Sequence, residues 1–206
     1  PAGSNWVDTA SETPAGGMLW GNPDAKVKLI EYGALSCSHC AQFSADSSEG
    51  MKALIAKGTV SYEFRSFMLN AIDIPAFLLV KCNGAGPFFP LTEQMFAAQH
   101  DWLGKAQTIT PEEQKAWTAL KPNQLADSIA QKLGLVDFVT QRGVSADKAK
   151  ACLADPAGVA KLEKVAKEGQ EQFQISGTPT FIINGEKALD IGTWDKLEPA
   201  LIAAGA

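Results

Sequence analysis

The sequence predicts an α/β fold in which a helical block interrupts a sheet-forming pattern, in the order βαβ, helices, ββα. An apolar strand-like run at 27–32 is followed at once by a cysteine pair and an amphipathic helical pattern. Between 70 and 173 the periodicity is helical and divided by capping signals. Strand-like residues return at 180–183, ahead of an Asn-Gly dipeptide typical of hairpins. The helical block is therefore expected to be an insertion between strands.

The composition is that of an ordinary folded protein. The 206 residues are 46% apolar, which is enough for a well-packed interior. The formal net charge is -5, from 18 basic and 23 acidic residues without charge blocks, and this argues against a nucleic-acid-binding patch. No stretch approaches about 18 consecutive apolar residues. Because the chain begins at Pro1 without Met, we expect any export signal to have been removed or to lie outside this sequence.

The elements on the amino-terminal side follow from breakers and periodicity. Residues 1–24 are rich in Ser, Thr, Gly and Pro and are expected to form an extended lead-in. The strand at 27–32 leads to a helix over 38–57, which Gly58 ends. A second strand is expected at 60–68.

The helical block carries several start and stop signals. The start signals are Thr110-Pro111 with Glu113, Ser145, and Asp155-Pro156. A helical spacing of Leu125, Ile129 and Leu133 is followed by the stop signal Gly134. We therefore expect one sheet-containing domain made of 25–69 and 174–206, with 70–173 as a helical insertion.

The carboxy-terminal elements return to the sheet pattern. A strand at 180–183 precedes the turn residues Asn184-Gly185, and a partner strand is expected at 187–191. A closing helix is expected over 194–204, although Pro199 leaves its start open.

The tetrapeptide Cys37-Ser38-His39-Cys40 carries the chemistry, and all four residues are candidate catalytic residues. At the start of a helix, unpaired N–H groups and the helix dipole stabilise a thiolate and lower its pKa, so Cys37 is the expected nucleophile. Cys40 lies on the same helix face and can close a small disulfide ring. A structural disulfide or half of a zinc knuckle is the alternative. Haem attachment is excluded because Ala41 stands where a C-x-x-C-H motif needs histidine.

Two further residues are candidates for tuning this pair. His39 can hydrogen-bond the Cys37 thiolate or, when protonated, attract it; the alternative is a solvent-exposed turn residue. Glu31 shares strand parity with apolar residues of 27–32, so its carboxylate should face an apolar layer beneath the cysteines. Burial would raise its pKa and let it exchange a proton with Cys40. The alternative is a strand-end glutamate that reaches solvent.

The remaining cysteines are expected to be structural. Four cysteines with a single C-x-x-C fit two disulfides in an oxidising compartment better than a zinc site. Cys82 and Cys152 both fall in the helical block, and a bridge between them would remove unfolded-state entropy worth roughly 4 kcal/mol. The alternatives are two separate buried thiols or, more weakly, metal binding by all four cysteines.

Together these motifs resemble the DsbA-type proteins of the thioredoxin superfamily, over nearly everything from Gly21 onward. The resemblance rests on Gly21-Asn22-Pro23-Asp24-Ala25, Glu31 ahead of Cys37, the C-x-H-C motif, the helical insertion, and Gly177-Thr178-Pro179-Thr180-Phe181. It implies a thioredoxin fold, a low-pKa nucleophile, an oxidising disulfide, and a cis Thr178–Pro179 peptide bond that faces the cysteines and binds substrate. The family's representative oxidase has a further acid in the active-site helix where Ser44 stands here. Proton handling is therefore expected to rest more heavily on Glu31.

The resemblance also implies a function, namely donation of the Cys37–Cys40 disulfide to reduced exported proteins in a compartment such as the bacterial periplasm. A membrane-bound oxidant would regenerate the disulfide, and we expect a monomer without cofactor, metal or nucleic-acid partner. A disulfide isomerase or reductase on the same fold is the nearest alternative. From a different class, the chain could be a metal-binding or chaperone module that uses Cys37, His39 and Cys40.

Overall fold

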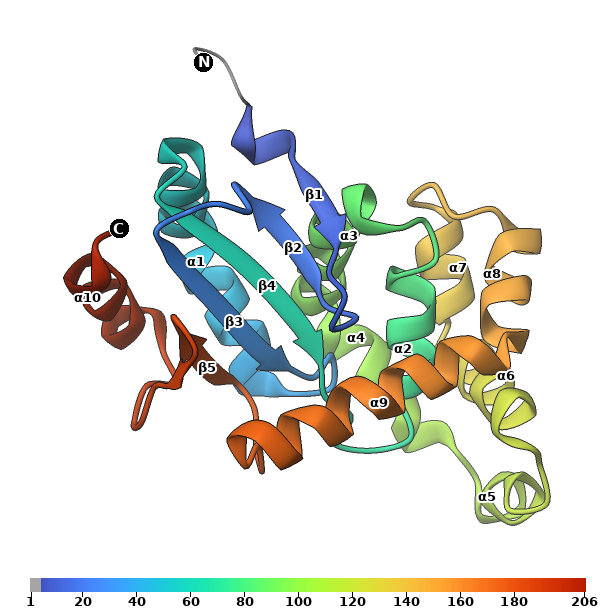
Figure 1. The fold of residues 1–206 in the computed structure, drawn as a ribbon. Helices are drawn as coiled ribbons and strands as arrows, with labels where there is room; N and C mark the ends of the chain where they lie inside the picture. Colours follow the sequence, from blue (N-terminus) through green and yellow to red (C-terminus); the bar gives the residue numbers. More distant parts are fainter. Residues whose placement is uncertain (1–4) are drawn as a thin grey trace.

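A six-stranded mixed sheet lies at the centre of the molecule, with the strand order β1-β2-β4-β3-β5-β6 (Figure 1). The structure is a computed structural model that describes residues 5–206, so residues 1–4 of the expected lead-in lie outside the described part. The strands are β1 (Ala10–Glu12), β2 (Met18–Gly21), β3 (Val27–Gly33), β4 (Val60–Ser66), β5 (Thr180–Ile183) and β6 (Glu186–Lys187). Strands β3 and β4 pair in parallel, whereas the other neighbours pair antiparallel. The order βαβ, helices, ββα expected from the sequence is confirmed.

The elements that carry the cysteine pair match the predicted ranges closely. Strand β3 ends one residue beyond the predicted 27–32, and β4 stops two residues short of 60–68. Helix α1 (Ser38–Lys57) has the predicted bounds. It ends at Gly58, whose φ of 74° lies in the left-handed region that glycine adopts without penalty.

The prediction for the last strand is wrong in length, because β6 covers two residues rather than 187–191. The Ala188 N–H still donates to the Phe181 carbonyl at 2.9 Å. Asp190 then adopts a φ of 59°, a left-handed conformation that ends extended pairing.

The expected lead-in contributes β1 and β2 to the sheet, which corrects the expectation that the sheet begins at 27. Strand β2 pairs antiparallel with β4, so that Gly21 lies opposite Ser61. These two strands are three and four residues long and lie among glycines and prolines, so the period-2 pattern has no room to appear.

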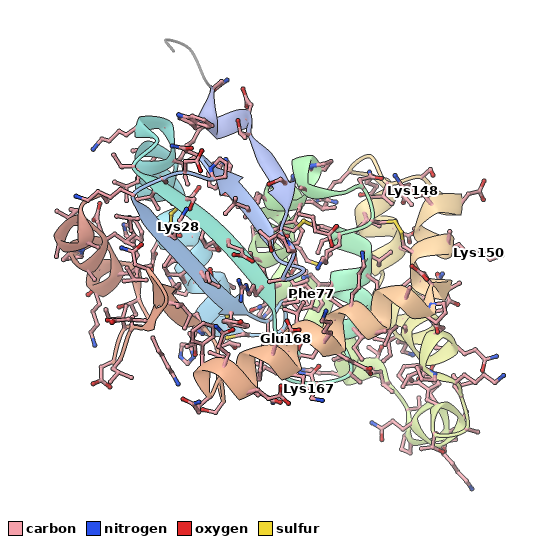
Figure 2. All side chains as sticks on the ribbon, viewed as in Figure 1. Lys28, Phe77, Lys148, Lys150, Lys167 and Glu168 are labelled. Carbon is pink, nitrogen blue, oxygen red and sulfur yellow. A yellow bond between two sulfur atoms is a disulfide. The ribbon has the colours of Figure 1, made fainter. Side chains whose placement is uncertain are left out.

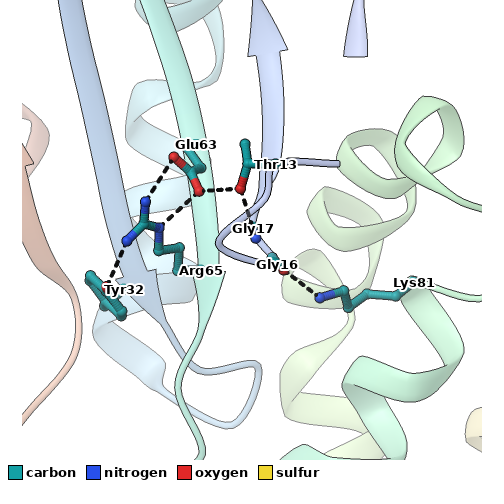
Figure 3. Close-up of polar contacts among 7 residues, drawn as sticks. All are labelled: Thr13, Gly16, Gly17, Tyr32, Glu63, Arg65 and Lys81. Atoms are coloured by element: carbon teal, nitrogen blue, oxygen red, sulfur yellow. Dashed lines mark hydrogen bonds and ion pairs between the residues drawn. The ribbon is translucent and has the colours of Figure 1, made fainter. Parts of the chain in front are cut away.

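Polar contacts tie the loop between β1 and β2 to two parts of the molecule (Figure 3). The Thr13 hydroxyl donates to Glu63 on β4 at 2.7 Å, and Glu63 also pairs with Arg65 at 2.8 Å. Lys81 follows α2 (Asp73–Val80), and its ammonium group donates a hydrogen bond to the Gly16 carbonyl at 2.9 Å. The loop is therefore held by both the sheet and the helical block.

Between β4 and β5 the chain is helical, as predicted for 70–173. The elements after α2 are α3 (Ala85–Ala97), α4 (Gln99–Gly104), the 3-10 turn η2 (Lys105–Thr108), α5 (Pro111–Trp117), α6 (Pro122–Lys132), α7 (Leu135–Thr140), α8 (Ala146–Ala154) and α9 (Pro156–Phe173). The predicted caps are present: Thr110 and Glu113 form a capping box, and the side chains of Ser145 and Asp155 cap α8 and α9. The closing helix α10 spans Trp194–Ala204 with Pro199 inside it.

Helices cover both faces of the sheet (Figure 1). On one face, α1 and α10 pack against a buried cluster that includes Val27, Leu29 and Phe181. On the other face, α9 packs through Val165 against Tyr32 and its neighbours. The largest cluster joins the sheet to the helical block, and Figure 2 shows one member, Phe77, near the centre of the molecule. The insertion thus shares its main core with the sheet.

A disulfide joins Cys82, after α2, to Cys152 on α8, with a Cα–Cα distance of 5.9 Å. Both cysteines belong to the helical block. Among residues 5–206, we find no helix with the length and apolar character needed to cross a bilayer.

Candidate active site

Cys37 is the N-cap residue of α1, in the turn that leaves β3. Its sulfur accepts a hydrogen bond from the Cys40 backbone N–H at 3.3 Å and lies 3.5 Å from the Thr178 carbonyl oxygen. A hydrogen bond from the Cys40 thiol, more than any other contact, lowers the pKa of Cys37 to about 5. Burial opposes this shift, while Thr178 and the backbone N–H groups of Cys40 and His39 add to it. Cys37 is therefore a thiolate at neutral pH.

Cys40 has the opposite electrostatics one helical turn later. Its side chain is fully buried, and burial is the main cause that raises its pKa far above the ordinary range. Its hydrogen bond to Cys37 and the nearby Glu31 carboxyl raise the pKa further. The two cysteines are free thiols in this structure, so it represents the reduced state. The Cys37 sulfur is therefore an ionised nucleophile at neutral pH, whereas the Cys40 sulfur is protonated.

Glu31 is 1% exposed, so the burial expected from strand parity is confirmed. The Tyr62 hydroxyl, on β4, donates a hydrogen bond to Glu31 Oε2. Oε1 has no partner among the described residues. Burial raises the pKa of Glu31 to about 8, the Tyr62 bond opposes the rise, and the nearby Cys37 adds to it. Near neutral pH the carboxyl is mostly protonated and can act as a proton donor.

His39 and Ser38 are both exposed on the first turn of α1. Within the part of the chain that the structure describes, the His39 imidazole makes no hydrogen bond; the backbone N–H of this residue is what acts on Cys37. The role expected for the imidazole stays a prediction. Ser44, where the resembled family has an acid, lies two turns further along α1 and lines a cavity that reaches Glu31.

The Thr178–Pro179 peptide bond precedes β5 and is cis, as expected. The Thr178 carbonyl faces the Cys37 sulfur, so the chain brings the expected substrate-binding segment against the redox pair.

Two residues of the helical block hold the turn before Cys37, and sequence reasoning missed both. Asp73 is fully buried and accepts hydrogen bonds from the Ser36 N–H at 2.8 Å and the Ser36 hydroxyl at 2.9 Å. Gln99, on α4, donates to the carbonyls of Leu35 at 2.7 Å and Cys37 at 2.9 Å. Asp73 is the acidic first residue of the otherwise apolar helix α2, which was a usable signal, whereas nothing local marks Gln99.

A metal-binding site is not formed by the residues that the structure describes, because no three His, Cys, Asp or Glu side chains come together in a suitable group. Cys37, His39 and Cys40 do not form such a group, which leaves the metal-binding alternative without structural support.

Residues 13–202 match a family model described as Thioredoxin. A Rickettsia bellii protein named "Putative protein-disulfide oxidoreductase" is 27% identical over 82% of this chain, and the chain spans only 57% of that relative's length. The thiol:disulfide interchange protein DsbA of Pseudomonas aeruginosa is 25% identical, with 93% of this chain and 76% of the relative covered.

Among solved structures, a protein-disulfide isomerase from Novosphingobium aromaticivorans is similar, with a TM-score of 0.85 and 28% identity. The match covers 91% of this chain and 97% of that one. The likeness therefore extends over both the sheet and the helical block.

Proposed function

We propose that this chain, which belongs to the thioredoxin family, is a thiol:disulfide oxidoreductase. In this proposal it donates the Cys37–Cys40 disulfide to reduced proteins. The observation that carries this proposal is the opposite ionisation of the two sulfurs, with a Cys37 pKa of about 5 beside a buried, protonated Cys40. A low-pKa thiolate is a good leaving group and stabilises the reduced protein, which makes the disulfide an oxidant.

The reaction begins with the oxidised pair. A substrate thiolate attacks Cys37 Sγ, the Cys37–Cys40 bond breaks, and its electron pair goes to Cys40 Sγ, which takes a proton that Glu31 can supply. A second thiolate of the substrate then attacks the substrate sulfur that is bonded to Cys37 in the mixed disulfide. Cys37 leaves as a thiolate, so the substrate has lost two electrons and the enzyme has gained them. An external oxidant must restore the disulfide.

Substrates, compartment and regeneration partner follow from the same proposal. Reduced exported proteins are the proposed substrates, in an oxidising compartment such as the periplasm, because the chain carries the Cys82–Cys152 disulfide in addition to the redox pair. A membrane-bound oxidant is the proposed regeneration partner, and the protein is proposed to act as a monomer. The name of the Pseudomonas aeruginosa relative, a thiol:disulfide interchange protein, supports this class of reaction.

Two measurements test the proposal. The oxidised protein should convert a dithiol peptide to its disulfide with one peptide oxidised per protein, and Cys37→Ser should abolish the conversion. The Cys82→Ala/Cys152→Ala double variant is the control and should retain it. Equilibration with glutathione should give a reduction potential more positive than about −200 mV. A value near −270 mV would identify a reductant and overturn the oxidase proposal.

A disulfide isomerase is the second candidate, because the similar Novosphingobium aromaticivorans structure is named a protein-disulfide isomerase. The reduced protein would then restore activity to ribonuclease with scrambled disulfides in many turnovers. An oxidase would leave the scrambled pairing unchanged under the same conditions.

A further inference from the structure

The Cys37–Cys40 disulfide can be re-formed only if the buried Cys40 thiol loses its proton. Cys40 is 0% exposed, and burial raises the pKa of its thiol far above the ordinary range. The thiol therefore needs a base inside the protein. Glu31 is the carboxyl whose charge acts on Cys40, and it is itself only 1% exposed. Regeneration thus requires an ionised Glu31 in a place that water hardly reaches.

The sheet offers an ionised Glu31 little stabilisation. Its partners in register are Phe64 on β4 and Phe181 on β5, and neither side chain carries a charge or a hydrogen-bond donor. Within residues 5–206, Glu31 takes part in no ion pair. The charged residues that line a cavity together with Glu31 are all exposed, namely Asp8, Lys52 and Glu93. A buried carboxylate in such surroundings depends on hydrogen bonds.

The Tyr62 hydroxyl supplies the one hydrogen bond that the Glu31 carboxyl receives from the described residues. It donates to Oε2, while Oε1 has no partner. Tyr62 lies opposite Leu29 in the register of β3 and β4, so its side chain shares a face of the sheet with Glu31. Phe89 packs against the Tyr62 ring, with the centroids 5.7 Å apart. A hydrogen bond from a neutral donor stabilises a carboxylate more than a protonated carboxyl.

We propose that Tyr62 is a positioning residue for the regeneration step: its hydroxyl holds Glu31 as a carboxylate while this carboxylate takes the proton from Cys40. The inference rests on the proposed disulfide exchange and gives Tyr62 a role in it. Within the described chain Tyr62 makes no hydrogen bond to either sulfur, so it acts through Glu31. Because Oε2 accepts from Tyr62, Oε1 is left to receive the proton.

The step balances with a disulfide oxidant such as glutathione disulfide. The Cys37 thiolate attacks one sulfur of the oxidant, a mixed disulfide forms, and the first glutathione thiolate leaves. Glu31 then takes the proton of Cys40, and the Cys40 thiolate attacks Cys37 Sγ and expels the second glutathione thiolate. The protein has lost two electrons to the oxidant. The proton is left on Glu31 and passes to solvent before the next cycle.

The second step, in which Cys40 resolves the mixed disulfide, should report the ionisation of Glu31. The titratable groups that face Glu31 are Tyr62 from β4 and the two cysteines from α1, and its neighbour from β5 is uncharged. In the mixed disulfide Cys37 cannot ionise, and burial keeps Tyr62 and Cys40 protonated. The rate of resolution should therefore rise with pH as Glu31 ionises. Formation of the mixed disulfide depends on the Cys37 thiolate instead.

Tyr62→Phe removes only the hydroxyl. The full-length reduced protein is mixed with glutathione disulfide, quenched with acid at intervals and analysed by mass spectrometry, which separates the reduced, mixed-disulfide and oxidised forms. In Tyr62→Phe we expect the midpoint of the rise in resolution rate to move up by about one to two pH units, as expected for a lost hydrogen bond to a charged group. At pH 7 resolution should slow by about tenfold or more. The rate of formation should not change.

Two further substitutions separate positioning from a merely structural role. Tyr32→Phe is the matched control, because Tyr32 is also buried and its hydroxyl accepts from Arg65 at 3.0 Å, on the face of the sheet that α9 covers. It should leave both rates unchanged. Glu31→Gln should slow resolution and remove its rise with pH, and adding Tyr62→Phe should then have no further effect. A general loss of packing would slow resolution in both backgrounds.

A stronger donor should shift the pH profile in the opposite direction. The chain has two tyrosines, so biosynthetic 3-fluorotyrosine in the Tyr32→Phe protein labels Tyr62 alone. Fluorine withdraws electrons from the ring and makes the hydroxyl a stronger donor, so the midpoint should be lower than in unlabelled Tyr32→Phe. This measurement keeps the Tyr62 ring in place and does not depend on the folding of Tyr62→Phe.

Three results would each disprove the role of Tyr62. They are a pH profile of resolution in Tyr62→Phe that matches the wild type, an equal slowing by this substitution in the Glu31→Gln background, and a fluorotyrosine protein whose midpoint is unchanged or higher. Oxidases and reductases both pass through this mixed disulfide. A reduction potential typical of a reductant would therefore overturn the oxidase proposal and leave the role of Tyr62 standing, whereas these three results would leave the oxidase proposal standing.

Discussion

Two sulfurs on one helical turn differ in protonation because they meet different surroundings. Cys37 lies at the N-terminus of α1, where backbone N–H groups and the Cys40 thiol point at its sulfur. Cys40 lies one turn deeper, where it has no solvent-exposed surface and Glu31 lies nearby. The spacing of the motif thus places one residue in an anion-binding position and the other in the core.

Alkylation should distinguish the two cysteines. At pH 6, iodoacetamide should label Cys37 and spare Cys40, since only the first is a thiolate at that pH. The rate of labelling should rise through a midpoint of about 5, read by mass spectrometry of the reduced protein. Preferential labelling of Cys40, or a midpoint near that of an ordinary thiol, would contradict the assignment.

Replacing Glu31 by Gln should stabilise the protein at neutral pH. The folded pKa of Glu31 is raised from 4.5 to about 8, so the folded state holds a proton that the unfolded state has lost in this interval. Its contribution to stability therefore declines as pH rises from 4.5 to 8, and at pH 7 the cost is about 3 kcal/mol. Glutamine avoids this cost and can still accept the Tyr62 hydrogen bond.

The measurement is urea unfolding of the reduced wild type and Glu31→Gln at several pH values. The two should be similar near pH 4.5 and diverge as the pH rises, with the variant the more stable. A difference that does not depend on pH would show that the Glu31 carboxyl does not titrate abnormally.

At the scale of elements, long-range contacts from the helical block shape the active-site turn. Gln99 on α4 supplies donors for the carbonyls of Leu35 and Cys37, and Asp73 at the start of α2 accepts from Ser36. Neither position can be found by periodicity, because periodicity describes a residue's neighbours along the chain and not its partners across the fold. Cys37, Cys40 and Glu31 were found because spacing and strand parity are local properties.

The same distinction between local signals and long-range contacts explains which helices and strands were predicted and which were missed. Caps and breakers are local, and they correctly predicted the bounds of α1, β5 and α10. Strands β1 and β2 were missed because they are short and depend on pairing with β4. The cavity behind Glu31 was also beyond the sequence, since its walls come from elements that only the fold brings together.

Gln99→Met should destabilise the protein by about 1–3 kcal/mol, because methionine has a similar shape but leaves two buried carbonyls without this donor. Gln114→Met, on the exposed face of α5, is the matched control and should change stability by less than about 0.5 kcal/mol. Denaturant unfolding of both variants checks this. Equal effects of the two substitutions would mean that the Gln99 hydrogen bonds contribute nothing.

At the scale of the whole molecule, the Cys82–Cys152 disulfide crosslinks the helical block over a sequence separation of 70 residues. Its removal in Cys82→Ala/Cys152→Ala should lower the free energy of unfolding by about 4 kcal/mol, chiefly because the unfolded chain gains conformations. Both proteins are unfolded with Cys37 and Cys40 reduced. Peptide mapping without reductant should give one linked peptide that contains both cysteines, and two free thiols there would disprove the bridge.

The redox state of the Cys37–Cys40 pair should change the stability of the whole fold, with the reduced protein the more stable at pH 7. The folded pKa of Cys37 is lowered from 9.0 to about 5, so the stabilisation by its thiolate is fully present above pH 9 and is lost as the pH falls through 5. At pH 7 part of it remains, about 1–2 kcal/mol after solvent screening. The disulfide closes a very short loop and restricts the unfolded chain little, so it does not compensate.

Unfolding of the oxidised and reduced forms at pH 7 and at pH 4, with Cys82–Cys152 intact in both, tests this directly. The reduced form should lose its advantage at pH 4, because Cys37 is then protonated in both the folded and the unfolded state. If the oxidised form is instead the more stable at pH 7, thermodynamic linkage requires that the fold favours the disulfide. The pair would then be a reductant, and the proposed direction of electron flow would be reversed.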